Sequence, residues 1–134
     1  MDLSSIIEIA TVSDTGQKRP HNEDSAVTSA AAGLAVVADG MGGYKAGEVA
    51  SAIAAKCIVD KIETGLEEAH SAEPNGADYR PESELIRDAI TEANSHIFKT
   101  AQTVQQCQGM GQATYDSHVF LSMAPFSNFV IYKF

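Results

Sequence analysis

An aspartate and several glycines directly follow a short apolar run in the first third of the chain. The run is Leu-Ala-Val-Val-Ala at residues 34–38, and the next residues are Asp39 and Gly40, with further glycines at 42 and 43. A carboxylate at the end of a buried strand is costly to desolvate unless a cation meets it there. Glycine lets the backbone approach a ligand closely and exposes a carbonyl oxygen as a second donor. Because such oxygens suit Mg²⁺ or Mn²⁺, Asp39 and Gly40 predict half of a metal site.

A second set of charged side chains lies upstream, where Arg19 is followed by Glu23 and Asp24. One interpretation is a solvated ion pair at the surface, which contributes only ~0–1 kcal/mol to stability. The alternative is a functional loop, in which the guanidinium grips a phosphate bidentately while both carboxylates face a cation. The Asp39–Gly40 pair downstream favours the functional loop.

Three segments have strand-forming sequences that would position these residues, namely 6–12, 24–28 and 34–38. They are rich in β-branched or small residues, and the Asp-Thr-Gly sequence at 14–16 favours a turn after the first of them. We therefore expect an antiparallel meander, with the Arg19 loop between its first two strands.

Two longer segments have helical periodicity. Apolar residues recur at four- or five-residue steps over 46–66 and at helical spacing over 86–104. Pro81 fits the first position of the second helix, and Gly65 predicts fraying near the end of the first. The polar stretch 67–80 is predicted to be an exposed connection. Two helices after three strands predict a helical layer on a sheet.

Composition indicates one soluble domain. The chain has 134 residues, 44% of them hydrophobic, and its net charge is −9. This excess of negative charge argues against nucleic acid or an anionic membrane as a partner. Cys57 and Cys107 have no Cys-x-x-Cys spacing and are predicted to be reduced thiols on helix faces. Without a recognisable secretory signal or membrane span, the expected location is the cytoplasm.

Three linked motifs occur in order along the chain. They are Gly-Gln-Lys-Arg-Pro-His-Asn-Glu-Asp at 16–24, Val-Val-Ala-Asp-Gly-Met-Gly-Gly at 36–43 and Ala-Gly-Glu-Val-Ala-Ser at 46–51. Together they resemble the metal-dependent serine/threonine protein phosphatases of type 2C, in particular their bacterial branch, from about Val12 to Gly111. The resemblance implies an α/β (α+β) fold, here the N-terminal part of a β-sandwich of two antiparallel sheets flanked by helices.

The resemblance also implies roles for residues at matching positions. Asp39 matches the aspartate that bridges two metal ions, and Gly40 matches the residue whose carbonyl oxygen binds one of them. Glu23 and Asp24 match the acidic pair that holds metal directly, through water or from further out. Arg19 matches the arginine that binds the substrate phosphate.

The implied reaction is hydrolysis of phosphoserine or phosphothreonine in protein substrates. Two Mn²⁺ or Mg²⁺ ions would activate a shared water for in-line attack on phosphorus, and no phosphoenzyme is needed. Arg19 and the metals would neutralise charge on the equatorial oxygens. Some relatives have a histidine just after the Asp-Gly pair as a proposed proton donor. Here Met41 occupies that position, so metal-bound water would have to supply the proton.

The sequence departs from the family pattern after Gly111. The family typically continues with paired threonines, a strand and a Gly-Asp-Ser-Arg segment, whereas this chain has Gln-Ala-Thr-Tyr at 112–115. The later metal-binding aspartates have no counterpart, because Asp116 is the only acidic residue after Gly111 and its context does not match. We therefore divide the chain into a phosphatase-like N-terminal part, 1–111, and a divergent, aromatic-rich C-terminal tail, 112–134.

A shifted reading frame or a truncated gene would explain this change of character. With few ligands for an octahedral ion, we expect metal to bind weakly, and exposed sheet edges would favour aggregation. The sequence accordingly predicts weak or no phosphatase activity for this polypeptide alone.

Two other functions fit parts of the sequence. Gly40-x-Gly42 after a strand, with Asp60 about twenty residues further on, partly matches a dinucleotide-binding motif. Lys45 replaces its third glycine, however, and Asp39 would repel the pyrophosphate. The other alternative is a non-catalytic module that binds a phosphoprotein or a partner chain. Zinc chemistry is disfavoured, because the histidines are scattered without ligand spacing, at His21, His70, His96 and His118.

Overall fold

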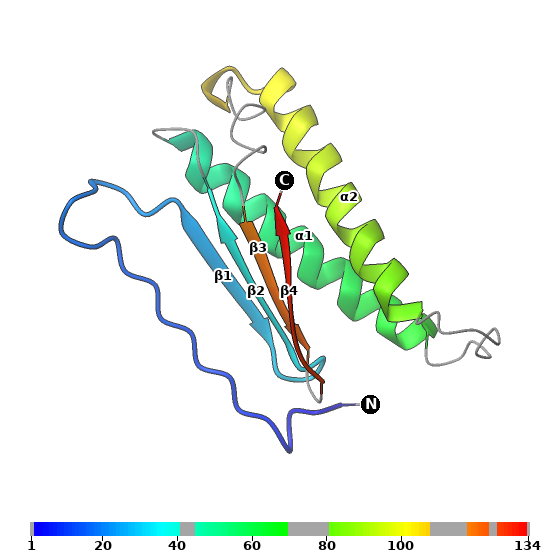
Figure 1. Ribbon diagram of the computed structural model, residues 1–134. Coiled ribbons are helices and arrows are strands. Elements are labelled where there is room, and N and C mark those ends of the chain that lie inside the picture. Colours follow the sequence, from blue (N-terminus) through cyan, green and yellow to red (C-terminus); the bar gives the residue numbers. More distant parts are fainter. Residues whose placement is uncertain (1, 41–44, 70–80, 108–117, 124–125, 134) are drawn as a thin grey trace.

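The computed structural model describes residues 2–40, 45–69, 81–107, 118–123 and 126–133. These residues form a four-stranded antiparallel sheet, two long helices and a short 3-10 helix. The elements in chain order are β1 (Asp24–Ser29), β2 (Leu34–Asp39), α1 (Lys45–Ala69), α2 (Pro81–Thr103), η1 (Gln105–Cys107), β3 (His118–Met123) and β4 (Phe126–Lys133). Figure 1 shows α1 behind the sheet and α2 running beside α1.

The sheet consists of two hairpins. Residues 30–33 join β1 to β2, and Gly33 takes a φ of 62°, a left-handed conformation that glycine adopts without strain. β3 pairs with β2, and β4 pairs with β3, so the strand order is β1-β2-β3-β4. In the sequence, the two long helices therefore lie between the first pair of strands, β1 and β2, and the second pair, β3 and β4.

The hydrophobic core lies between the sheet and α1 and continues between α1 and α2. Alternate residues of β2 face the helix, so Leu34 and Val36 are 0% exposed while Val37 is 39% exposed. From α1, Ile58 and Ile62 are also 0% exposed. Burial of aliphatic side chains of this size contributes roughly 1.5–3 kcal/mol each, and this contact fixes α1 on the sheet.

Both predicted helices are confirmed, and they pack antiparallel to each other (Figure 1). Gly65 allows a close approach, because a Cβ at this position would lie 2.3 Å from Leu85 Cδ1. The expected fraying at Gly65 is wrong, since α1 continues to Ala69. Most of the predicted connection at 67–80 lies outside the described residues. No helix in the described ranges is long and apolar enough to cross a bilayer.

Two of the three predicted strands are confirmed and one is wrong. β1 and β2 include the predicted segments 24–28 and 34–38, but residues 6–12 have no strand structure. Ile6 is 77% exposed and Val12 is 93% exposed. β-Branched residues favour a strand only where neighbouring strands and packing support it. The third strand beside the first hairpin is β3 instead.

Candidate metal and phosphate site

Pairing of β1 with β2 brings two aspartates together at one end of the sheet. Asp24 begins β1 and Asp39 ends β2, and their Cα atoms are direct partners in the antiparallel register. Side chains of directly paired residues project from the same face of a sheet. The Asp39 carboxyl group lies near enough to raise the pKa of Asp24. The structure thus joins two residues that the sequence assigned to one site.

The electrostatic effect of this pairing is clearest at Asp24. Although the residue is solvent-exposed, partial burial of its carboxyl group raises its pKa, and the nearby Asp39 raises the pKa further. The positive charge of Arg19 lowers the pKa of Asp24, and Glu23 raises it slightly. The corner is therefore acidic, and Arg19 lies near enough to act on it.

Gly40 and Gly47 bring the Glu23 carboxylate close to a backbone carbonyl. The Gly40 amide donates a hydrogen bond to the Glu23 carbonyl oxygen at 3.2 Å. A Cβ on Gly47 would lie 2.7 Å from Glu23 Oε2 and 3.1 Å from the Gly40 carbonyl oxygen. Both oxygens therefore border one small space, which stays open because position 47 has no side chain.

Two serines hold the start of α1 against β1. The Ser51 hydroxyl donates to the Glu48 carbonyl oxygen at 3.1 Å and lies 3.1 Å from Ser25 Oγ, so Ser25 is the donor between the two hydroxyls. Ser51 is only 2% exposed. This contact places the first turn of α1, with Gly47, beside the Glu23 carboxylate. The helix dipole favours negative charge at that end.

Asn22 ties the Arg19 loop to the site. Its Oδ1 accepts a hydrogen bond from the Asp24 amide at 3.0 Å, and its Nδ2 donates to Ser13 Oγ. The sequence motifs predict no role for Asn22, although asparagine commonly bonds to the backbone two residues on. Asn22 is therefore a positioning residue that turn chemistry could have identified.

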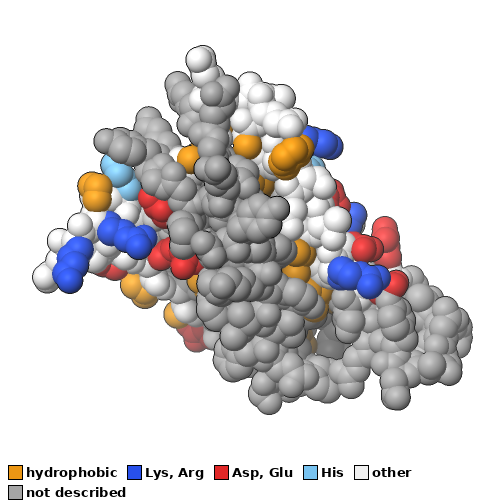
Figure 2. Space-filling view, turned by 45° about the horizontal axis from the view of Figure 1, so that its top comes forward, with side chains coloured by type: hydrophobic (Ala, Val, Ile, Leu, Met, Phe, Trp, Pro, Cys, Tyr) orange, Lys and Arg blue, Asp and Glu red, His pale blue; other side chains and the backbone are white. Residues whose placement is uncertain are grey.

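Figure 2 shows exposed acidic side chains beside Lys and Arg side chains on the viewed face.

The oxygen atoms available at this corner are of the kinds that bind a hard divalent cation. Glu23, Asp24 and Asp39 offer carboxylate oxygens, and Gly40 offers a carbonyl oxygen, as Mg²⁺ and Mn²⁺ prefer. A cation beside Asp24 and Asp39 would offset their mutual repulsion. Among the described residues, no group of three or more His, Cys, Asp or Glu side chains is already arranged to hold a metal ion. The side chains would therefore have to move when metal binds.

Other predictions fall elsewhere in the chain. Met41, Gly111 and Asp116 lie outside the described residues. The dinucleotide alternative is not supported, because such sites require a parallel sheet and this sheet is antiparallel. Asp60 lies within α1 and pairs with Lys56 on the same helix.

Comparison with known proteins identifies the class. The family model described as protein phosphatase 2C matches residues 16–117. The chain is 34% identical over 103 residues to the serine/threonine phosphatase Stp of Listeria monocytogenes, covering 73% of this chain and 37% of that protein. It is 43% identical over 51 residues to the protein phosphatase PhpP of Streptococcus pneumoniae, covering 36% of this chain and 21% of that one.

Solved structures agree with this class. One is described as PppA, a key regulatory component of T6SS in Pseudomonas aeruginosa, with a TM-score of 0.59, 25% identity and coverage of 86% of this chain and 43% of that one. Another is the Mycobacterium tuberculosis serine/threonine phosphatase PstP/Ppp, with a TM-score of 0.50, 30% identity and coverage of 81% and 38%.

The chain belongs to the protein phosphatase 2C family, which confirms the resemblance and the mixed α/β fold class. It spans 37% of the length of the Listeria relative and similarly limited parts of the others.

Proposed function

We propose that this chain supplies a metal-binding and phosphate-binding corner for hydrolysis of phosphoserine and phosphothreonine in proteins. The observation that carries the proposal is the direct pairing of Asp24 with Asp39 in the strand register, next to Gly40. Family membership supports the reaction class. The excess of negative charge supports a protein substrate over nucleic acid, and we place the reaction in the cytoplasm.

Mn²⁺ or Mg²⁺ is the proposed cofactor. Asp39, Asp24 and Glu23 would hold it with carboxylate oxygens, and Gly40 would add its carbonyl oxygen. When bound, such an ion supplies Lewis acidity and lowers the pKa of a coordinated water. The space beside Gly47 leaves room for the Glu23 carboxylate and the Gly40 carbonyl to turn toward the ion.

Arg19 is the proposed phosphate-binding residue. Its guanidinium can donate two parallel hydrogen bonds to phosphate oxygens. Its effect on the pKa of Asp24 supports a position at the same corner. Asn22 would orient the loop through its bonds to Asp24 and Ser13.

We propose weak activity for this polypeptide alone. Mg²⁺ requires near-octahedral coordination, and three carboxylates with one carbonyl would leave most positions of two ions to water. We also propose that 1–111 is the phosphatase-like unit and that 112–134 is a divergent segment. In the structure, β3 and β4 from this segment extend the sheet next to β2.

Calorimetric titration with Mn²⁺ tests the proposal on the unaltered chain, Asp39→Asn and the control Asp88→Asn, an exposed aspartate on α2. Binding should occur in the unaltered chain and the control, and should be lost in Asp39→Asn. Slow turnover of a phosphothreonine peptide should follow the same pattern. Equal Mn²⁺ binding by all three proteins would refute the assignment of the site.

The sparse donor set also favours a second candidate, a non-catalytic module that binds phosphoproteins. This function predicts retention of a phosphothreonine peptide without turnover at any Mn²⁺ concentration. Arg19→Ala should abolish the retention, and Lys18→Ala, a change at the neighbouring position, should preserve it. Turnover that depends on Asp39 would exclude this candidate.

A further inference from the structure

A hydrogen bond between two serines joins β1 to the beginning of α1. Ser25 Oγ lies 3.1 Å from Ser51 Oγ, and the Ser51 hydroxyl donates in turn to the Glu48 carbonyl oxygen at 3.1 Å. Ser25 faces α1 because it pairs directly with Ala38, which is 1% exposed. The two hydrogen bonds therefore form a directed chain from the strand to the backbone of the helix.

The surroundings of this chain are small and apolar. Ala46 and Ala50 of α1 and Ala38 of β2 are buried in the same hydrophobic cluster. Apolar contacts have no preferred direction, so they hold α1 against the sheet without fixing the rotation of the helix about its own axis. A hydrogen bond requires alignment as well as distance. The serine pair therefore fixes this rotation.

The two serines lie at matched distances from the proposed metal site. Glu23 is two residues before Ser25, about 6–7 Å along an extended chain. Gly47 is four residues before Ser51, about 6 Å along a helix. Both steps return to the same side of their element, and β1 and α1 run in the same direction in Figure 1. The serine bond therefore turns Gly47 toward Glu23, where a Cβ on Gly47 would lie 2.7 Å from Glu23 Oε2.

We propose that the Ser25–Ser51 hydrogen bond sets the affinity of the proposed site for Mn²⁺, because it holds Gly47 against the Glu23 carboxylate. Neither serine would touch the metal, so both are positioning residues. The inference rests on the proposed function, in which Glu23 is a metal ligand. Rotation of α1 would move the first turn of the helix and release the Glu23 side chain from its place.

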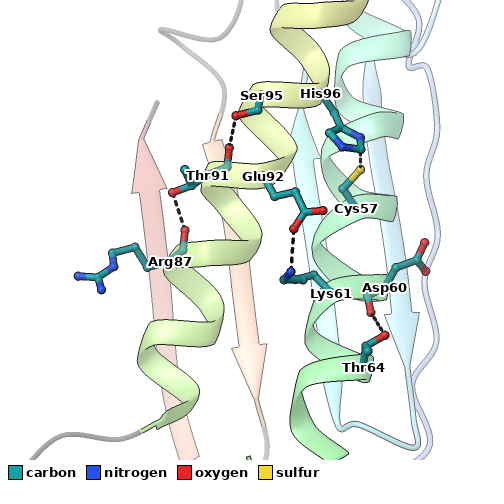
Figure 3. A network of polar contacts seen from close by, with 9 residues as sticks. All are labelled: Cys57, Asp60, Lys61, Thr64, Arg87, Thr91, Glu92, Ser95 and His96. Carbon is teal, nitrogen blue, oxygen red and sulfur yellow. Dashed lines mark hydrogen bonds and ion pairs between the residues drawn. The ribbon is translucent and has the colours of Figure 1, made fainter. Parts of the chain in front are cut away.

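Other polar contacts hold the middle of α1 against α2. Lys61 Nζ lies 2.9 Å from Glu92 Oε2, and Cys57 Sγ lies 3.6 Å from His96 Nδ1, as Figure 3 shows. Cys57 and Lys61 follow Ser51 by six and ten residues along the helix. Loss of one of these contacts should therefore leave the first turn of α1 in place.

Calorimetric titration with Mn²⁺ tests the proposal. Ser25→Ala and Ser51→Ala should each weaken binding by about tenfold or more, as expected for groups that position a metal ligand. The double variant should show about the same loss as Ser51→Ala alone, because both changes remove the same bond. Ser25→Thr keeps the hydroxyl and should retain the affinity of the unaltered chain.

Ser29→Ala is the matched control. Ser29 is a buried serine at the other end of β1, and its Oγ accepts a hydrogen bond from the Ala32 amide at 3.2 Å. Loss of this bond should lower the thermal midpoint and leave the Mn²⁺ affinity unchanged. Glu92→Gln, which weakens the contact of α2 with α1, should also leave the affinity unchanged.

Unchanged Mn²⁺ affinity in Ser25→Ala and Ser51→Ala would overturn the proposal. Equal weakening in Ser29→Ala would overturn it too, because the loss of affinity would then follow stability alone. No Mn²⁺ binding by the unaltered chain would instead refute the proposed metal site.

Hydrogen exchange in EDTA tests the positioning role without metal. The Gly40 amide donates to the Glu23 carbonyl oxygen, and the Gly47 carbonyl packs against Gly40. This amide should exchange faster in Ser51→Ala than in the unaltered chain, and at an unchanged rate in Ser29→Ala. Equal exchange in all three proteins would show that the serine bond does not position the start of α1, whatever the result with Mn²⁺.

Discussion

At the scale of single residues, the candidate site depends on missing side chains as well as on charges. A Cβ on Gly40 would lie 2.2 Å from the Gly47 carbonyl oxygen and 2.5 Å from that of Glu23, both of which are backbone atoms. A Cβ on Gly47 would instead meet the end of the flexible Glu23 side chain. Gly40 is therefore needed for the fold, whereas Gly47 is needed mainly for the position of Glu23.

Substitution of the two glycines should separate these roles. Gly47→Ala should weaken Mn²⁺ binding by about tenfold or more and change the free energy of unfolding by less than about 1 kcal/mol, because alanine suits a helix. Gly40→Ala should destabilise the protein by about 1–3 kcal/mol, since the strand and helix backbones must move apart. Calorimetry and urea denaturation measure both quantities. Equal destabilisation by the two changes would contradict this division.

The paired aspartates should favour metal binding but lower the stability of the metal-free protein at neutral pH. The pKa of Asp24 is raised above its ordinary value of 3.8, so the folded state binds this proton more tightly than the unfolded chain. Its contribution to stability is therefore present below pH 3.8 and is lost as the pH rises through the folded pKa. At neutral pH the ionised pair repels.

Asp24→Asn should accordingly stabilise the metal-free protein at pH 7 by about 0.2–1 kcal/mol, because it removes like charges from directly paired positions. The gain should shrink at pH 3, below the ordinary pKa of 3.8, because Asp24 in the unaltered chain takes up its proton as the pH falls through its raised pKa. Urea denaturation in EDTA at the two pH values provides the measurement. Destabilisation at pH 7 would show that the other contacts of the Asp24 carboxylate outweigh its repulsion by Asp39.

At the scale of the elements, α1 connects the site to the core. Its first turn borders Glu23 through Gly47, and its second half buries Ile62 in the hydrophobic core at 0% exposure. Ile62→Ala should therefore destabilise the protein by about 2–5 kcal/mol. Phe98→Ala on α2, where the ring is 58% exposed, should change stability by less than about 0.5 kcal/mol. Thermal or urea unfolding of the two variants provides the measurement. Similar losses of stability in both would contradict the assignment of Ile62 to the core.

The elements also show what sequence patterns could predict. Helical periodicity located α1 and α2 because each buries one apolar stripe, and the apolar run before Asp39 located β2 because its alternate residues face the core. The pattern at 6–12 failed because no strand in the described residues pairs with it. The contacts of Gly47 with Glu23 and of Cys57 with His96 depend on how the helices dock, which local sequence does not encode.

At the scale of the whole molecule, net charge and metal binding should act on stability together. With a net charge of −9, any cation screens repulsion in the folded state, so a stabilising effect of Mn²⁺ is not by itself evidence for the site. Binding at a specific site further raises the free energy of unfolding as the site fills. The increase reaches about 2.7 kcal/mol when the Mn²⁺ concentration is one hundred times the dissociation constant. Urea denaturation in MnCl₂, compared with NaCl of equal ionic strength, should show this excess in the unaltered chain. Asp39→Asn should retain the screening effect and lose the excess, and an equal excess in both proteins would place the Mn²⁺ somewhere other than the Asp24–Asp39 corner.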